Sequence, residues 1–257
     1  MVGGSRGLTG AVCLAATAAA RAGAGYVTAL VPASLEAIFE VKLTEVMTRG
    51  LPDADGALAV EAAQLALAEA GRHGGALVLG SGLGRAEATR DMAIELAEEC
   101  PLGLVLDADG LNAFAGQVRW IRPRAAATIL TPHAGELGRL LGVDSAEVDA
   151  ERLRHARTAA AQADAVVVLK GDDTLVAAPD GRVIVSPGAA PGLATAGTGD
   201  VLAGVCGALL AAGLDAFPAA VAGVELHRRA GQLAALAAGS ARAVIAGDVV
   251  AQLGHVS

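Results

Sequence analysis

Short, almost entirely apolar segments recur along the first two thirds of the chain. A glycine-rich or polar turn and a helical pattern follow most of them. The clearest segments are residues 76–79 (ALVL), 102–106 (LGLVL), 126–130 (AATIL) and 165–169 (AVVVL). Strands without polar alternation are buried on both faces, as in parallel sheets that helices cover on each side. The pattern therefore predicts an α/β protein with a doubly wound, mostly parallel sheet and helices on both faces.

The alternation of apolar segments and helical patterns ends after residues 165–169. Residues 174–178 and 182–186 are short and β-rich, and they flank Pro179-Asp180-Gly181, a hairpin turn signal. We therefore expect a late β-hairpin. No low-complexity linker or internal repeat divides the chain, so we expect a single domain over residues 1–257. Met1–Val2 resembles the stub of a strand, which suggests a truncated first strand.

Charge and composition exclude several classes of protein. The formal net charge is −8 and the 19 basic residues are scattered, which argues against nucleic acid or an anionic membrane as a partner. Aromatic residues make up only 2%, too few for base-stacking platforms. The three cysteines lack metal-ligand spacing and are typical of reduced thiols. Reduced thiols indicate a cytoplasmic protein. No uncharged apolar stretch approaches the roughly 20 residues of a membrane span, so we expect no segment that crosses a bilayer.

Polar and glycine residues gather where the apolar segments end. The endings are GSGLG (80–84), DAD (107–109), TPHAGE (131–136) and KGDDT (170–174). In open α/β sheets the ligand binds outside the carboxyl ends of the strands. The endings together therefore predict a binding site at that edge of the sheet.

A glycine-punctuated loop leads into an apolar helix within Pro187–Leu214. Gly197 and Gly199 allow the backbone to approach a ligand closely, and the start of the helix offers unpaired N–H groups to an anion. Asp200 is out of place in such an anion site, because a carboxylate repels phosphate. It fits there as a base that takes the proton of a hydroxyl about to meet phosphate.

Several strand-end residues allow two interpretations. Gly80–Gly84 either cradles a phosphate or forms an ordinary tight turn. Asp107 and Asp109 either hold a magnesium–phosphate group or include a helix N-cap at Asp109. His133 either has a role in the site, by contacting a substrate or by helping to position magnesium with Glu136, or is a structural or exposed histidine.

Lys170 ends the most hydrophobic segment of the chain. Its ammonium either meets phosphate oxygens or forms a salt bridge with Asp172 or Asp173. The chain contains no Walker A loop and no nucleophile elbow with a Ser/His/Asp arrangement. These observations favour phosphoryl chemistry, in which a protein mainly positions groups and stabilises charge.

Six motifs occur together in a fixed order: GGSRGLTGA, GSGLG, DADGLN, TPHAGEL, KGDDT and GLATAGTGDVLAG. In order and spacing they resemble the ADP-dependent NAD(P)H-hydrate dehydratases, a family of the ribokinase-like fold, from Gly3 to about Leu253. The resemblance implies a hydro-lyase for nicotinamide nucleotide repair. Its substrates would be (6S)-NADHX or (6S)-NADPHX, with ADP as co-substrate converted to AMP and phosphate, and Mg²⁺ as cofactor.

The resemblance also implies roles for individual residues. Asp200 would be the catalytic base that accepts the proton of the substrate's C6 hydroxyl. Substrate contacts would come from Ala11, Gly82 or Gly84, Asn112, His133 and Asp200. The nucleotide site would comprise Lys170, Gly171, Asp172, Asp173, Thr174, Gly197 and Gly199. The metal ligands stay open, with Asp107 and Glu136 as candidates.

Two features separate this chain from the family pattern, and two other functions stay open. Ala189-Ala190 stands where the family has Gly-Asn. The sequence also starts without the strand that precedes GGS in the family and without an amino-terminal epimerase domain, and whether it is a fragment stays open. A ribokinase-like kinase for a vitamin precursor would use the same Asp200 but release a stable phosphorylated product. A catalytically inactive nucleotide-binding module is the other alternative. The family implies a homo-oligomer, commonly a tetramer.

Overall fold

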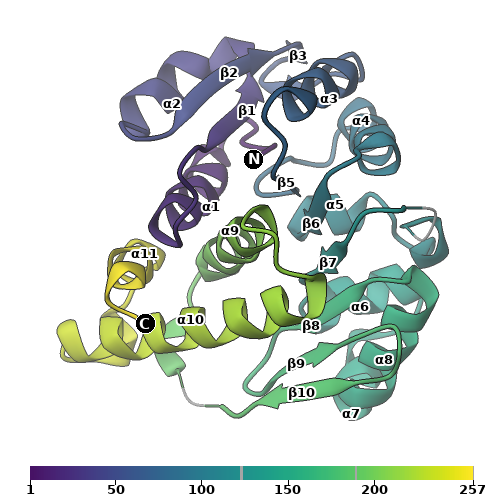
Figure 1. Cartoon of the computed structure of the whole chain (residues 1–257), viewed down its shortest axis with the longest axis vertical. Coiled ribbons are helices and arrows are strands. Elements are labelled where there is room, and N and C mark those ends of the chain that lie inside the picture. The colour runs from purple at the N-terminus through teal and green to yellow at the C-terminus, as the bar shows by residue number, and fades with distance from the viewer. Residues whose placement is uncertain (122–123, 189, 257) are drawn as a thin grey trace.

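The computed structural model describes residues 1–121, 124–188 and 190–256. A sheet runs through the middle of the molecule, and helices lie on both sides of it (Figure 1). In chain order the strands are β1 (Thr28–Pro32), β2 (Met47–Leu51), β3 (Asp53–Ala54), β4 (Ala57–Leu58), β5 (Ala76–Leu79), β6 (Gly103–Leu106), β7 (Thr128–Leu130), β8 (Val166–Leu169), β9 (Thr174–Ala177) and β10 (Val183–Ser186).

The helices follow or precede strands along most of the chain. They are α1 (Thr9–Arg21), α2 (Glu36–Lys42), α3 (Ala62–His73), α4 (Glu87–Glu99), α5 (Ala108–Asn112), α6 (Ala134–Leu141), α7 (Ser145–Ala150), α8 (Arg152–Ala163), α9 (Thr198–Ala211), α10 (Ala216–Ala237) and α11 (Ala246–Gln252). Within the described ranges, none of these helices is long and apolar enough to cross a membrane.

The strand order confirms the predicted sheet. Strands β5, β6, β7 and β8 pair in parallel in chain order. Strand β9 pairs antiparallel with β8, and β10 pairs antiparallel with β9, which forms the predicted hairpin. At the other side, Val2 makes single parallel bridges to Leu30 of β1 and Leu79 of β5. These bridges join the parallel pair β1–β2 to the larger sheet.

Both faces of the sheet are buried under helices. In β5, Leu77 and Leu79 pack toward α3, α4, α6 and α8, whereas Val78 packs toward α9 and α10. Figure 1 shows these two helix groups on opposite sides of the strands. Because successive side chains of a strand point to opposite faces, burial on both sides requires apolar residues at every position. This requirement explains the unbroken apolar segments of the sequence.

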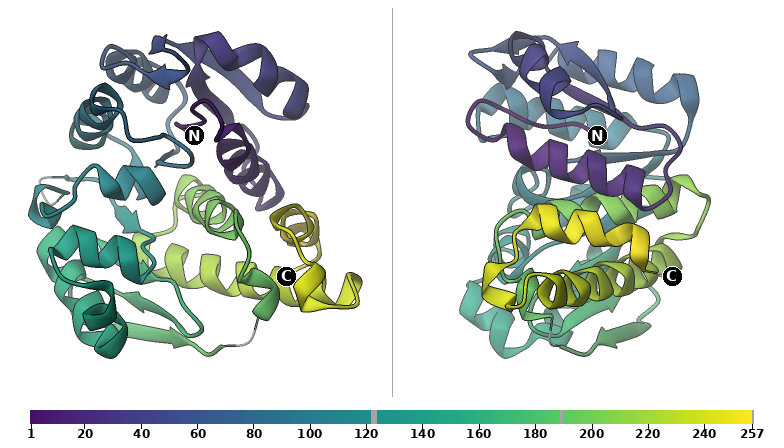
Figure 2. Two further views of the ribbon diagram at one scale, coloured as in Figure 1. Left: turned by 180° about the vertical axis from the view of Figure 1, so that it is seen from behind. Right: turned by 90° about the vertical axis from the view of Figure 1, so that its left-hand side faces the viewer.

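Helix α9 lies against both the sheet and helix α1. A Cβ atom on Gly204 would lie only 2.1 Å from the carbonyl oxygen of Ala15, so a glycine is needed where α1 and α9 touch. Val201 and Val205 of α9 are buried in an apolar cluster that also includes residues of α10 and α11. Figure 2 shows α1, α10 and α11 close together beside α9. The tight packing holds the start of α9 at the carboxyl edge of the sheet.

Candidate active site

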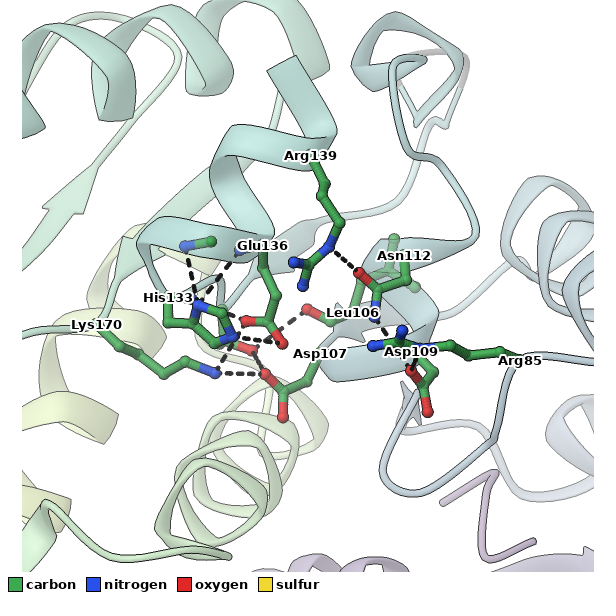
Figure 3. Close-up of polar contacts among 11 residues, drawn as sticks. Arg85, Leu106, Asp107, Asp109, Asn112, His133, Glu136, Arg139 and Lys170 are labelled. Carbon is green, nitrogen blue, oxygen red and sulfur yellow. Dashed lines mark hydrogen bonds and ion pairs between the residues drawn. The ribbon is translucent and has the colours of Figure 1, made fainter. Parts of the chain in front are cut away.

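The carboxyl ends of β6, β7 and β8 bring three polar side chains together (Figure 3). Asp107 follows β6, and only 2% of it is exposed. The Lys170 ammonium after β8 donates to Asp107 Oδ1 at 2.8 Å. The hydroxyl of Thr131, which follows β7, donates to the same oxygen at 2.7 Å. Because the carboxylate of Asp107 is buried, it needs a charged partner and hydrogen-bond donors, and the neighbouring strand ends supply them.

His133 and Glu136 form a capping box at the start of α6. The Nδ1 atom of His133 accepts hydrogen bonds from the backbone N–H of Gly135 at 3.0 Å and of Glu136 at 3.3 Å. In return, Glu136 Oε2 accepts from the His133 backbone N–H at 2.8 Å. Because Nδ1 accepts, the proton of the neutral ring sits on Nε2. The Nε2–H of this half-exposed ring is therefore the donor, and Nε2 lies 3.5 Å from Glu136 Oε1.

The same cluster extends from α6 to Lys170. Glu136 Oε2 lies 3.6 Å from the Lys170 ammonium. Burial by itself lowers the pKa of Lys170, but the carboxylates of Asp107 and Glu136 outweigh it and raise the pKa. The ammonium is therefore held in its charged form. The alternative of a salt bridge to Asp172 or Asp173 is wrong, because Lys170 pairs with Asp107 and Glu136 instead.

The start of α9 lies beside this ammonium. Gly197 adopts a left-handed conformation (φ 90°) just before the helix, which begins at Thr198. A Cβ atom on Gly199 would lie 3.3 Å from Lys170 Nζ. The free backbone N–H groups of the helix start and the lysine charge thus converge on one place, as an anion site requires.

Asp200 in the first turn of α9 has a perturbed acidity. Burial raises its pKa to about 6, and the charge of Asp107 acts in the same direction. The Ser81 hydroxyl and the Lys170 ammonium oppose the shift. The Ser81 hydroxyl is buried and makes no hydrogen bond of standard geometry within the described chain, although it lies near enough to favour the charged carboxylate. A carboxylate with this pKa is ionised at neutral pH and more basic than usual, which suits a general base.

A cavity of about 640 Å³ opens beside the start of α9. Six of the residues singled out from the sequence line it: His133, Lys170, Gly171, Asp172, Thr174 and Gly199. Apolar side chains, including Leu202 and Val224, form other parts of its wall. The cavity therefore combines a charged region that fits phosphate with apolar surface that fits a flat ring.

Two predicted nucleotide residues lie next to this cavity without lining it. Asp173 Oδ1 accepts from the backbone N–H of Gly188 at 2.8 Å, which ties the KGDDT turn to the segment after β10. A Cβ atom on Gly197 would lie 2.7 Å from Leu14 Cδ1, so this glycine allows close packing against α1. Of the Ala189-Ala190 pair, Ala190 lines the cavity, whereas Ala189 lies outside the described residues.

A second group of predicted residues surrounds the start of α5. Gly84 donates from its backbone N–H to Asp109 Oδ2 at 3.0 Å, and Asn112 Nδ2 donates to Asp109 Oδ1 at 3.1 Å. The Arg139 Nε atom donates to Asn112 Oδ1 at 2.8 Å. The N-cap interpretation of Asp109 is wrong, because Asp107 holds the cap position and Asp109 anchors the glycine loop.

Ala11 and Gly82 are neighbours on the amino-terminal side of the site. A Cβ atom on Gly82 would lie 3.1 Å from Ala11 Cβ and 2.6 Å from the Leu8 carbonyl oxygen. Gly82 also has a positive φ of 64°. The GSGLG loop therefore packs directly onto the start of α1, with Ser81 placing its hydroxyl near Asp200.

The described ranges contain no group of three or more His, Cys, Asp and Glu side chains that could hold a metal ion. The two candidate ligands, Asp107 and Glu136, both face the Lys170 ammonium, at 2.8 and 3.6 Å. The ammonium already neutralises the oxygens Asp107 Oδ1 and Glu136 Oε2. Any metal here therefore depends on ligands that a bound nucleotide would supply.

Sequence reasoning missed four residues that shape the site. Arg152 of α8 donates from Nη2 to the carbonyl oxygens of Leu169, Lys170 and Asp173 at 3.0 to 3.3 Å. Arg139 and Thr131, described above, hold Asn112 and Asp107. The buried His227 lines the large cavity, and burial lowers its pKa to about 4.

Comparisons with known proteins agree with this geometry. A family model described as NAD(P)H-hydrate dehydratase matches residues 1–251. A bifunctional NAD(P)H-hydrate repair enzyme from Moorella thermoacetica is 45% identical over 256 residues, which cover 99% of this chain and 48% of that protein. An ADP-dependent (S)-NAD(P)H-hydrate dehydratase from Neisseria meningitidis is 38% identical over 97% of this chain and 81% of that protein.

A solved structure matches as well. The ADP/ATP-dependent NAD(P)H-hydrate dehydratase from Bacillus subtilis, co-crystallised with ATP and Mg²⁺, has a TM-score of 0.80 and 28% identity. The match covers 99% of this chain and 86% of that one. The sheet order and the glycine loop at α9 thus define a protein with a ribokinase-like fold. More narrowly, the chain belongs to the NAD(P)H-hydrate dehydratase family. It spans about half the length of the bifunctional relatives that it matches.

Proposed function

We propose that this chain dehydrates (6S)-NADHX and (6S)-NADPHX to NADH and NADPH while converting ADP to AMP and phosphate. The observation that carries the proposal is the placement of Asp200 in the first turn of α9. This carboxyl, with its pKa raised to about 6, lies near enough to the charged Lys170 to feel its ammonium, and both Lys170 and the neighbouring Gly199 line the 640 Å³ cavity. The same arrangement supports the resemblance on which the sequence interpretation rests.

The first step transfers a phosphoryl group. Asp200 takes the proton of the C6 hydroxyl, and the hydroxyl oxygen attacks the terminal phosphorus of ADP as the bond to AMP breaks. The Lys170 ammonium and the backbone N–H groups at the start of α9 stabilise the negative charge on the phosphate oxygens. His133 offers its Nε2–H to the substrate.

The second step releases phosphate. The phosphate on C6 leaves with the bonding electrons, and a proton is lost from the neighbouring ring carbon, so that the ring regains its double bond. The products are the reduced cofactor, AMP and phosphate. Phosphorylation therefore turns hydroxide, a poor leaving group, into a good one.

ADP and the hydrated dinucleotide bind on opposite sides of the Lys170–Asp107 pair. ADP binds in the large cavity against Lys170, Gly171, Thr174 and Gly199, with its adenine on apolar wall residues such as Leu202. Asp172 lines the same cavity, and Asp173 and Gly197 support it from outside. The hydrated nicotinamide lies toward Ala11, Gly82, Gly84, Asn112 and His133, within reach of Asp200.

We expect Mg²⁺ to bind together with the nucleotide. Mg²⁺ in such enzymes is usually held by one or two carboxylates together with substrate phosphates and water. Asp107 Oδ2 and Glu136 Oε1 are the carboxylate oxygens that do not face Lys170 in the interactions above. When bound, Mg²⁺ supplies charge neutralisation on the nucleotide phosphates. We also propose that the protein forms a homotetramer, as the family resemblance implies.

The decisive test supplies ADP and hydrated NADH and follows absorbance in the reduced-nicotinamide band. Recovery of NADH with one AMP and one phosphate per turnover supports the proposal. Stable phosphorylation of an alcohol such as a vitamin precursor, without NADH recovery, would identify the kinase alternative. Binding of ADP without any turnover would identify the inactive module. The Asp200→Asn variant separates these cases, because a working base is worth several orders of magnitude in turnover.

A further inference from the structure

A second cavity, of about 180 Å³, lies apart from the nucleotide cavity and is lined by three arginines. Arg85 follows the GSGLG loop, Arg90 lies on α4 and Arg139 lies on α6. Asp109 is the single acidic residue in the lining. In a chain with a net charge of −8, this concentration of guanidinium groups is unusual and marks the cavity as attractive to anions.

Among the interactions of the described residues, each arginine is held through its Nε atom, which leaves its Nη donors available. Arg139 uses Nε to bind Asn112 at 2.8 Å. Arg90 uses Nε to bind the carbonyl oxygen of Ala113 at 3.1 Å. Arg85 Nε lies 3.6 Å from Asp109 Oδ1. A guanidinium has five N–H donors in a planar fork, so each side chain keeps donors that fit phosphate oxygens.

The arginine cavity adjoins the catalytic cluster on the side away from ADP. Arg139 stands three residues after Glu136 on α6, so both side chains share one face of that helix. Figure 3 shows Glu136 and Asp107 in the middle, with Lys170 to one side and the Arg139, Asn112 and Arg85 group to the other. Gly84 and Asn112, which the proposed function assigns to the substrate, line the cavity themselves.

We propose that Arg85, Arg90 and Arg139 form a phosphate-binding subsite for the part of the dinucleotide that extends beyond its hydrated nicotinamide ring. This inference rests on the proposed function. A dinucleotide with its ring at Asp200 carries its phosphates away from the reacting carbon, and guanidinium forks recognise phosphate through paired hydrogen bonds. The phosphate is either the pyrophosphate bridge, common to NADHX and NADPHX, or the 2′-phosphate, present only in NADPHX.

The experiment measures binding and turnover in Arg90→Gln and Arg139→Gln. For each variant, the KM for NADHX, NADPHX and ADP is determined, and the Kd of NADPH and NADH is measured by calorimetry at two salt concentrations. We expect about a tenfold loss of dinucleotide affinity, the usual effect of losing one charge-assisted hydrogen bond, and a shallower salt dependence. The KM for ADP stays unchanged, because Lys170 and its cavity are untouched.

The pattern of losses identifies the phosphate. Equal losses for both dinucleotides assign the pyrophosphate bridge, whereas a loss confined to NADPH and NADPHX assigns the 2′-phosphate. Arg139→Lys keeps the charge and should recover part of the affinity, which separates anion binding from a simple role in holding Asn112. Arg72→Gln is the matched control, since Arg72 is an exposed arginine at the far end of α3 that pairs with Glu69.

Two results would overturn the subsite. One is unchanged dinucleotide affinity in both glutamine variants, and the other is a loss that raises the KM for ADP equally. Failure of the proposed function would give a different experimental result. In that case the wild-type chain turns over neither hydrate, while the calorimetric loss of NADPH or NADH affinity in the variants still shows whether the arginines bind phosphate. If the wild type binds neither NADPH nor NADH, the subsite is refuted as well.

Discussion

The ammonium of Lys170 lies 2.8 Å from the carboxylate of Asp107, although 63 positions separate the two residues in the chain. The pair joins the ends of β6 and β8 across the intervening β7, where Thr131 donates to the same oxygen. One side of the pair faces the large cavity, because Lys170 lines it. The arrangement is therefore both a structural link inside the protein and a fixed positive charge at the cavity wall.

We expect Lys170→Met to fail in nucleotide binding and to be less stable than the wild type. Removing the ammonium leaves Asp107, whose side chain is 2% exposed, as an uncompensated buried charge. Breaking a buried pair in this way costs about 3 kcal/mol of unfolding free energy. Chemical denaturation measures the stability, and calorimetry with ADP measures the binding.

The double variant Lys170→Met/Asp107→Asn separates the two roles of this pair. It removes the buried charge together with its partner, so most of the stability should return while ADP binding stays lost. Equal stability of the single and double variants would contradict the structural role. Normal ADP affinity in Lys170→Met would contradict the role in phosphate binding.

The activity should depend on pH through Asp200. A general base works only in its ionised form, and burial raises the pKa of this carboxyl to about 6. We expect kcat/KM to fall about tenfold per pH unit below 6 and to level off above about 7. Initial rates of NADH recovery between pH 4.5 and 8.5 measure the profile. A flat profile through pH 6 would exclude Asp200 as the base that limits the rate.

The same carboxyl should lower the stability of the protein at neutral pH. Its pKa is about 6 in the folded chain against an ordinary value of 3.8, so the folded state binds more protons between these values. The contribution of Asp200 to stability therefore falls as pH rises from about 4 to about 6. We expect Asp200→Asn, although inactive, to gain up to about 3 kcal/mol of unfolding free energy at pH 7.5.

Measuring the unfolding free energy of wild type and Asp200→Asn at pH 5.0, 6.0 and 7.5 checks this sign. The difference should widen as the pH rises. A variant less stable than the wild type at pH 7.5 would show that the Asp200 carboxylate makes favourable contacts that outweigh its burial. Asp248→Asn is a suitable control, since Asp248 caps the start of α11 through the Ile245 backbone and lies outside the site.

The sheet and the strand-end motifs could be predicted from the sequence because both arise from local patterns. Unbroken apolar segments reflect burial on two faces, and the turn at Pro179–Gly181 predicts the hairpin that β9 and β10 form. The membership of the family could also be predicted, because its motifs are contiguous. Lys170 and Asp200, to which we assign the main roles in the proposed reaction, lie inside those motifs.

The partners of these residues could not be predicted in the same way. Lys170 has two aspartates within three positions, yet it pairs with Asp107, since only the assembled sheet brings the ends of β6 and β8 together. His133 caps its own helix, a use that a histidine rarely has and that its sequence position does not reveal. Arg139 and Arg152 lie on helices without a motif of their own, and their roles follow from tertiary contacts.

The last prediction concerns Arg152, which holds the turn that carries Lys170. Arg152 is not among the residues that line the 640 Å³ cavity. Its guanidinium binds the carbonyl oxygens of Leu169, Lys170 and Asp173 at 3.0 to 3.3 Å. A Cβ atom on Gly171 would lie 2.5 Å from Nη2, so the glycine makes room for this clamp. We therefore expect Arg152 to be a positioning residue for the proposed ADP site.

We expect Arg152→Met to raise the KM for ADP about tenfold through a looser turn, with little effect on the KM for the dinucleotide. Arg154→Met is the matched control, because Arg154 lies on the same helix, is 60% exposed at its side chain and pairs with Glu147 on the surface. Gly171→Ala should imitate Arg152→Met, since its methyl group displaces the same guanidinium. A uniform loss of kcat with unchanged KM for ADP in both variants would instead place the effect of the clamp on the chemical step.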